Sequence, residues 1–379
     1  MRRAEPAERR RLGELFAELC AIESPSRHER RCADRVVAEL RALGLDVDED
    51  RVGDQLGGDA GNVLSRVPGP PGAPTMLLCA HLDTVPPAAP IEPVLVDDGW
   101  ENAHDGILGA DNKAAVAAFL MVAGRCAAEP PQVGIELLFT VGEEEALAGA
   151  KAFDRGRLEA SVGFVFDHAS PLGEVVVASP TYHRIEAELT GAAAHAGIRP
   201  EAGRSAILAA ARAIAAMPHG RLDPETTANV GTIAGGTAGN VVPDRCRILA
   251  EARSLDEPRV EQVVAQIVDA LHDGANATEC DLDVSVEALF RGYRTQPAAP
   301  GVRVAEQALR SAGFTPRHVV TGGGSDANAL EAAGLPCVNL ANGTERNHEP
   351  DERVSVAALG GALDVALALP AAAAEILTA

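Results

Sequence analysis

Three short apolar runs in the first half of the chain limit its fold more than any other feature. They span 75–79, 134–139 and 162–166, and a helical stretch over about 112–126 separates the first two. Apolar runs of this length, without a polar residue at every second position, are typical of strands buried on both faces. We therefore expect an α/β layer with a largely buried sheet.

The middle of the chain has a different texture. Between 182 and 293 we predict the order strand, helix, strand, strand, helix, strand, which is that of the split βαβ, ferredoxin-like unit. After 294 the α/β pattern resumes. We therefore predict a discontinuous first domain, 1–181 and 294–379, with an α+β domain inserted at 182–293. Two domains also suit a chain of 379 residues, since single cores divide beyond about 250–300 residues.

Two helices are predicted at the amino terminus. Leu12, Leu15, Phe16 and Leu19 recur at helical spacing. The segment Ser26-Arg-His-Glu29 has the pattern of a capping box and predicts that a second helix opens there.

Histidine and carboxylate side chains follow the predicted strands at the points where each strand ends. In open α/β sheets, functional residues collect at the carboxyl ends of the strands. Each candidate alone has an ordinary structural explanation: a satisfied strand-end histidine, a helix N-cap, a solvated helix start or a loop histidine. Taken together, they suggest one metal site built from distant segments. The candidates are His81, Asp83, Asp111, Glu143, Glu144, Asp167 and His348.

Two neighbouring pairs among these residues have a chemical logic of their own. Asp83, two residues after His81, could orient the imidazole and fix its tautomer. Of the adjacent Glu143 and Glu144, one could ligate a metal while the other acts as general base on water. The pattern therefore points to a metal-dependent hydrolase.

Composition excludes other classes. A formal net charge of −22 and a pI near 4.8 disfavour nucleic acid and anionic membranes as partners, because both would be repelled. Seven dispersed cysteines, with no CxxC pair, indicate reduced thiols in a cytoplasmic protein. The basic amino terminus lacks the apolar core of a signal peptide, and Asp364 and Pro370 interrupt the alanine-rich carboxyl end.

The motifs resemble those of the cocatalytic zinc metallopeptidases that include peptidase T, carboxypeptidase G and aminoacylase. The resemblance runs over nearly the whole chain and implies a zinc-exopeptidase-like catalytic domain with a ferredoxin-like lid. It implies that Asp111 bridges two Zn²⁺ ions per chain, for which Co²⁺ or Mn²⁺ could substitute. His81 and Asp167 would complete one site, Glu144 and His348 the other, with Glu143 as general base and Asp83 as the orienter of His81.

The resemblance also extends to the inserted domain. His195 matches a lid histidine that polarises the substrate carbonyl in relatives, and Asn240 lies where relatives contact substrate. Arg253 could bind a substrate carboxylate. Each of the three also has a plain structural reading, as a strand-end histidine, a turn asparagine or a structural arginine. The lid commonly dimerises in this family, which makes a homodimer a further expectation.

The loop 321–328, rich in glycine, favours the peptidase T-like branch. The expected function is an aminopeptidase that acts on short peptides. One alternative keeps the metal centre but cleaves N-acyl amino acids, as a deacylase or a carboxypeptidase. Another class of alternative is a metal-binding or peptide-binding protein without catalysis.

Overall fold

The computed structural model describes residues 3–169 and 171–378. The chain divides into two compact units, one formed by Met1–Val177 with Thr295–Ala379 and the other by Ala178–Arg294. The predicted α/β catalytic body with an inserted antiparallel α+β domain is confirmed as the fold class.

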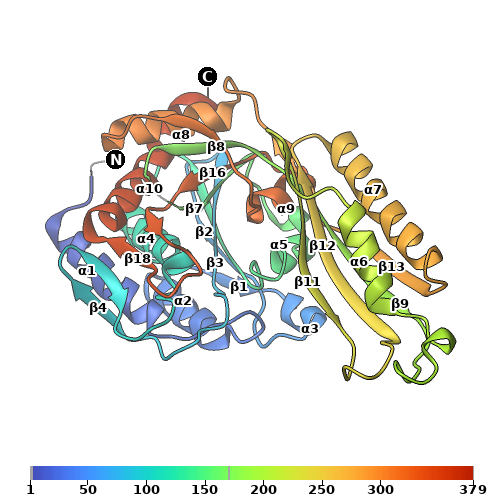
Figure 1. Ribbon diagram of the computed structural model, residues 1–379. Coiled ribbons are helices and arrows are strands. Elements are labelled where there is room, and N and C mark those ends of the chain that lie inside the picture. Colours follow the sequence, from blue (N-terminus) through green and yellow to red (C-terminus); the bar gives the residue numbers. More distant parts are fainter. Residues whose placement is uncertain (1–2, 170, 379) are drawn as a thin grey trace. The chain divides into compact units, whose positions relative to one another are not determined.

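The first unit is built around a nine-stranded mixed sheet (Figure 1). Its four central strands are parallel to one another and almost completely buried, because helices cover both faces. In sheet order these are β6 (Gly134–Thr140), β3 (Thr75–His81), β7 (Val162–His168) and β16 (Cys337–Ala341).

The remaining strands of this sheet extend it on both sides. One side carries β2 (Val63–Val67) and β1 (Val47–Glu49). The other carries β8 (Glu174–Ser179), with β15 (Arg317–Val320) paired to it, and β14 (Tyr293–Arg294), the last residues of the second unit. A separate four-stranded sheet has the order β17 (Thr344–Glu345), β18 (Arg353–Ser355), β5 (Gly99–Asn102), β4 (Pro93–Val96).

Helices form a layer on each face of the main sheet (Figure 1). One layer contains α1 (Pro6–Cys20), α2 (Arg30–Ala42), α4 (Ala110–Ala128), α8 (Pro300–Ala312) and α10 (Val356–Leu377). The other contains the shorter α3 (Val52–Leu56), α5 (Ala148–Ala152) and α9 (Asp326–Ala332).

The two amino-terminal helices differ in how well the sequence predicted them. The helical spacing in α1 is confirmed, since Leu12, Leu15, Phe16 and Leu19 are all buried. The capping box proposed for the second helix is wrong: α2 begins at Arg30, and Glu29 is its N-cap without a side-chain cap. The Ser26 hydroxyl instead donates a hydrogen bond to Asp83.

One helix among the described residues is long and apolar enough to cross a membrane by length and composition alone. This is α10, and 78% of its most apolar window is buried inside the protein. It packs against α4 and α8. A core helix passes the same test, so this feature is weak evidence for a membrane span.

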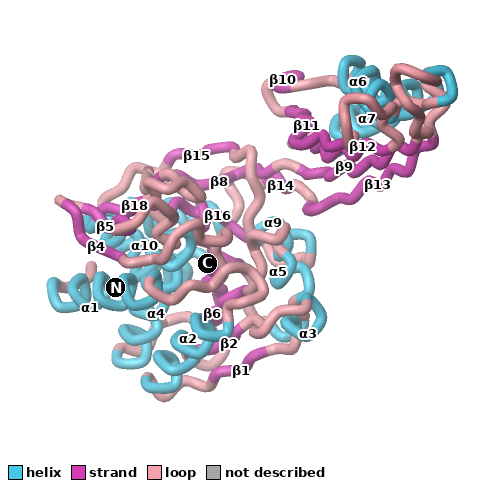
Figure 2. Tube along the Cα trace, turned by 60° about the horizontal axis from the view of Figure 1, so that its bottom comes forward, coloured by secondary structure: helices cyan, strands magenta, loops and turns pink. Residues whose placement is uncertain are grey.

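The second unit is an antiparallel sheet with two helices on one face (Figure 2). Alternate residues of β9, such as Ile185 and Leu189, are buried on the helical side, while Glu186 on the other face is exposed. The sheet order is β10 (Gly220–Asp223), β11 (Thr226–Gly235), β12 (Arg245–Ser254), β9 (Thr181–Thr190), β13 (Asp281–Phe290), and the helices are α6 (Ala206–Ala216) and α7 (Glu257–Asn276).

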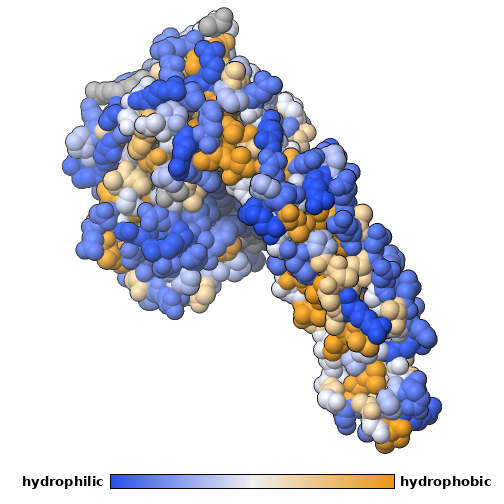
Figure 3. Space-filling view, turned by 45° about the horizontal axis from the view of Figure 1, so that its top comes forward, coloured by the Kyte–Doolittle hydropathy of each residue, from blue (hydrophilic) through white to orange (hydrophobic). Residues whose placement is uncertain are grey.

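The side of the molecule seen in Figure 3 is largely hydrophilic, with smaller apolar areas between the hydrophilic residues.

Candidate metal centre

The four buried parallel strands position the candidate site, because their carboxyl ends meet at one edge of the sheet. His81 is the last residue of β3, and Asp167 lies near the end of β7. Glu143 and Glu144 follow β6 after the turn at Gly142, whose φ of 62° lies in the left-handed region. His348 belongs to the loop between β17 and β18.

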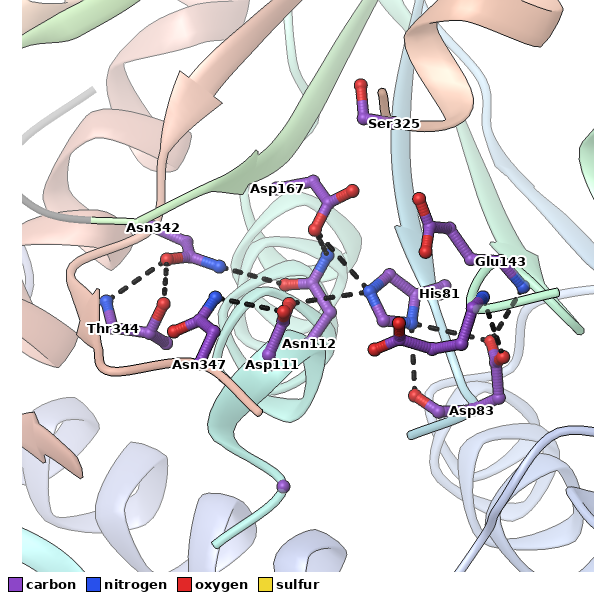
Figure 4. A network of polar contacts seen from close by, with 12 residues as sticks. His81, Asp83, Asp111, Asn112, Glu143, Asp167, Ser325, Asn342, Thr344 and Asn347 are labelled. Atoms are coloured by element: carbon purple, nitrogen blue, oxygen red, sulfur yellow. Dashed lines mark hydrogen bonds and ion pairs between the residues drawn. The ribbon is translucent and has the colours of Figure 1, made fainter. Parts of the chain in front are cut away.

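Asp111 contacts both histidines of this group, and Figure 4 shows it between His81 and Asn347. Its Oδ1 is 3.4 Å from Nε2 of His81, and its Oδ2 is 3.4 Å from Nε2 of His348. On the first side, Asp167 Oδ1 is also 3.4 Å from Nε2 of His81. On the second, Glu144 Oε1 is 2.8 Å from Nε2 of His348. The side chains thus form two three-residue groups that share one carboxylate.

The donor set fits two divalent cations. Each group combines one imidazole with carboxylates whose ligand atoms all lie within 4.8 Å of one another, which is the chemistry that zinc accepts. Asp111 Oδ1 is buried and has no hydrogen-bond partner among the described residues. A buried carboxylate oxygen without a donor is costly unless a cation satisfies it.

The charges in the cluster lead to the same conclusion. Burial opposes a charge on His81, but the carboxylates of Asp167 and Asp111 outweigh it and raise the pKa of His81 well above its ordinary value. Hydrogen bonds to Asp111 and Glu144 raise the pKa of His348 to about 10. The carboxylates therefore keep both imidazoles protonated, so the cluster attracts positive charge.

The carboxylates respond in two ways. Burial would raise the pKa of Asp111, but the nearby imidazoles of His348 and His81 lower it well below its ordinary value. Burial, followed by the nearby charges of Asp111 and Asp326, raises the pKa of Asp167 to about 8. Burial and the Asp167 charge also raise the pKa of Glu143 well above that of a solvated glutamate.

Asp83 has more partners than a simple orienter of His81. Its backbone oxygen is 3.0 Å from Nδ1 of His81, and its Oδ1 is 3.4 Å from the same nitrogen. The carboxylate also accepts the backbone N–H groups of Glu143 at 3.0 Å and Glu144 at 3.1 Å. Ser26 Oγ donates to it at 2.6 Å. Asp83 thus joins the segment carrying the first histidine to the one carrying both glutamates.

Amide side chains surround the ligand carboxylates and were not anticipated from the sequence. Asn347 Nδ2 donates to Asp111 Oδ2 at 2.9 Å, and Asn112 Nδ2 to Asp167 Oδ1 at 3.4 Å. Asn342 in turn donates to Asn112 at 3.2 Å (Figure 4). These contacts join residues that lie far apart in the chain.

One supporting residue did leave a signal in the sequence. Asn339 interrupts the buried apolar strand β16, and its Oδ1 accepts the backbone N–H of Asp167 at 3.0 Å. Its Nδ2 donates to Ser325 Oγ at 3.1 Å. A polar residue inside a buried strand needs partners, and here those partners are a ligand segment and the glycine-rich loop.

The three residues predicted to bind substrate belong to the second unit. His195 pairs with Val241 in an isolated β-bridge, and the backbone oxygen of Asn240 accepts the N–H of Ala196 at 2.9 Å, so both predicted residues lie on adjoining segments. Arg253 lies 4.0 Å over the ring of Tyr182 and binds Glu251 at 3.1 Å. Their roles toward substrate stay predictions.

Comparisons with known proteins agree with this picture. Residues 180–279 match the peptidase dimerisation domain, and residues 62–198 match peptidase family M28. The chain is 38% identical over 363 residues to the uncharacterized protein YqjE of Bacillus subtilis, an alignment that covers 95% of this chain and 97% of that protein.

Two solved structures are similar over nearly their whole length. The aminopeptidase PepT of Bacillus cereus is 38% identical with a TM-score of 0.86, covering 95% of this chain and 97% of its own. A tripeptidase of Staphylococcus aureus is 33% identical with a TM-score of 0.92, covering 97% and 99%. The chain belongs to the M20/M28 family of metallopeptidases. Within that family it is a peptidase T-like M20 enzyme with an inserted dimerisation domain.

Proposed function

We propose that this metallopeptidase is a dizinc aminopeptidase that removes amino-terminal residues from short peptides. The single observation that carries the proposal is the position of Asp111, whose two oxygens face two separate ligand groups. The similarity to a B. cereus aminopeptidase and an S. aureus tripeptidase supports the choice of substrate.

Each residue of the centre has a defined task in this proposal. His81, Asp167 and Oδ1 of Asp111 would hold one ion, and Glu144, His348 and Oδ2 of Asp111 the other. Two zinc ions bound there would lower the pKa of a water molecule toward about 7 and polarise the scissile carbonyl.

Glu143 is the general base. Its carboxylate belongs to a group with His81 and Glu144 whose ligand atoms lie within 4.8 Å of one another. Among the described residues, no ion pair joins it to Asp111 or His348. A carboxylate at this position can accept a proton from water and return it to the leaving amine.

The test is Glu143→Gln, which keeps the shape of the side chain but cannot accept a proton. Turnover should fall by about 10²–10⁴-fold while zinc content stays at the wild-type value. A variant that retains near-normal turnover contradicts the role of Glu143. A wild-type protein that binds zinc and hydrolyses no amide favours a non-catalytic binding protein.

A substrate panel separates the aminopeptidase from its alternatives. We expect hydrolysis of dipeptides and tripeptides with a free amino group, and loss of activity when that group is acetylated. Faster cleavage of the acetylated substrates would instead identify a deacylase or a carboxypeptidase that uses the same centre.

We further propose that the enzyme is a cytoplasmic homodimer that pairs through the edge of β11. Residues 229–235 of this strand have no partner strand on the side away from β12 among the described residues, and none of them is charged. Ile233, Ile207 and Leu208 are 50%, 37% and 48% exposed, and a Cβ on Gly236 would lie 3.1 Å from Ile207, which brings α6 beside the end of this strand.

The other free edge of the sheet is unsuited to self-pairing. β13 carries Asp281, Asp283 and Glu287, whose like charges would repel those of a second copy. The match to the dimerisation domain ends at residue 279, before β13 begins. A cytoplasmic location agrees with seven cysteines that are all free thiols.

A further inference from the structure

Glu352 is a buried glutamate outside the two ligand groups around Asp111. It lies in the loop after His348, directly before β18, and it is only 2% exposed. A buried glutamate needs hydrogen bonds, and here they all come from one distant segment. Oε2 accepts the backbone N–H groups of Leu108 at 2.9 Å and Gly109 at 2.8 Å, and Oε1 accepts that of Asp111 at 2.9 Å.

These three N–H groups lie in the segment that leads into α4: Leu108 and Gly109 precede the helix, and Asp111 has non-helical backbone angles at a kink in its first turn. Backbone N–H groups at such a point have no partner within a helix and need another acceptor, such as a capping side chain. The N-cap of α4 is Gly109, which has no side chain to provide one. Asp111 is the nearest residue of capping type, and the sequence alone permits it that role.

Asp111 does not cap the helix in the structure. Its Oδ1 faces His81 and has no hydrogen-bond donor in the part of the chain that the structure describes, while its Oδ2 faces Asn347 and His348. A carboxylate engaged in capping would turn at least one oxygen toward the backbone and away from the histidines. The orientation of Asp111 therefore requires another group to bind the buried N–H groups of the segment that leads into α4.

We propose that Glu352 is a positioning residue, which binds the backbone leading into α4 from another part of the chain and leaves both oxygens of Asp111 for the metals. Because Glu352 and His348 share one loop, the same contact holds the His348 loop against the Asp111 segment. This inference rests on the proposed metal centre and assigns it a residue that supports the shared ligand.

The test uses Glu352→Gln, whose amide has one acceptor oxygen and an NH₂ group that faces backbone N–H groups. The matched control is Glu349→Gln, because Glu349 is exposed on the same loop. Isothermal titration of the metal-free proteins with Zn²⁺ should give about 10–100-fold weaker binding for Glu352→Gln than for the wild type or the control. Glu352→Asp, which retains two acceptor oxygens, should recover part of the affinity.

A second measurement needs no metal. In hydrogen-exchange mass spectrometry of the metal-free proteins, peptides that contain residues 108–111 should exchange faster in Glu352→Gln, and peptides from β3 and β7 should not change. Wild-type exchange at 108–111 together with wild-type zinc affinity in Glu352→Gln would overturn the proposal. A wild-type chain that binds no zinc would instead overturn the proposed function. The exchange result would still decide whether Glu352 holds the backbone of residues 108–111. If Glu352→Gln does not fold, Glu352→Asp is judged by the same two measurements.

Discussion

The Asp83 carboxylate accepts a hydrogen bond from the backbone of Glu143, with Oδ1 3.0 Å from the amide nitrogen. The other oxygen of Asp83 accepts the N–H of Glu144 at 3.1 Å. The residue that was predicted to orient His81 thus also fixes the backbone of the proposed base and of a proposed ligand. Loss of this carboxylate should disturb both metal binding and proton transfer.

Asp83→Asn tests that arrangement. Its amide can accept only one of the two backbone N–H groups, so we expect kcat to fall by about 10–100-fold and the free energy of unfolding to fall by about 1–3 kcal/mol. The control is Ser26→Ala, which removes only the hydroxyl bound to the same carboxylate. It should lower the free energy of unfolding by about 1 kcal/mol. Steady-state kinetics and urea unfolding measure the two effects. The idea fails if Asp83→Asn is no slower than Ser26→Ala.

The sharing of Asp111 between two ligand groups predicts unequal metal losses. Asp111→Ala removes an oxygen from both groups, whereas His348→Ala removes an imidazole from only one. After reconstitution with zinc and removal of excess, Asp111→Ala should retain almost no metal and His348→Ala about half the wild-type content. Inductively coupled plasma mass spectrometry measures the zinc content of both variants. Equal zinc content in the two variants would argue against a bridging carboxylate.

The buried carboxyl group of Asp326 predicts a pH dependence of stability. Burial raises its pKa from 3.8 to about 6, although Thr140 Oγ1 donates a hydrogen bond to it. Between these values the folded protein binds more protons than the unfolded chain. In the metal-free protein the contribution of Asp326 to stability therefore declines as pH rises through this window and stays low above it.

Asp326→Asn removes this dependence, because its amide oxygen can still accept from Thr140 and cannot ionise. The free energy of unfolding of the metal-free variant, measured by urea unfolding, should gain on that of the wild type between pH 4 and pH 7 by on the order of 2–3 kcal/mol. Asp269→Asn, on the exposed face of α7, is the control. Its free energy of unfolding should differ from that of the wild type by the same amount at every pH in this range. The same constant difference for Asp326→Asn would refute the prediction.

A charge at the free edge of β11 should separate the proposed dimer. Ile233→Glu places like charges at the interface and should give a monomer in size-exclusion chromatography with light scattering, with an unchanged circular dichroism spectrum. Val286→Glu makes the same kind of change on β13, where Val286 is 43% exposed, and should leave the dimer intact. A dimer lost only in Val286→Glu would move the interface to β13.

The sequence was most informative for features that a short stretch of residues determines by itself. The buried strands 75–79, 134–139 and 162–166 could be predicted because continuous apolar runs suit a sheet covered on both faces. His81, Glu144 and Asp167 could be proposed as one cluster because strand ends in such a sheet share an edge. The order of elements also predicted the inserted domain.

The tertiary structure decided what depends on partners from distant segments. Ser26 has the pattern of a helix cap, yet its hydroxyl donates a hydrogen bond to Asp83, because a buried carboxylate needs hydrogen-bond donors. Asp111 could equally have been a cap, and only the position of Glu352, 241 residues away in the chain, releases its carboxylate toward both histidines. Local patterns specify which polar groups need partners, but folding determines which partners they find.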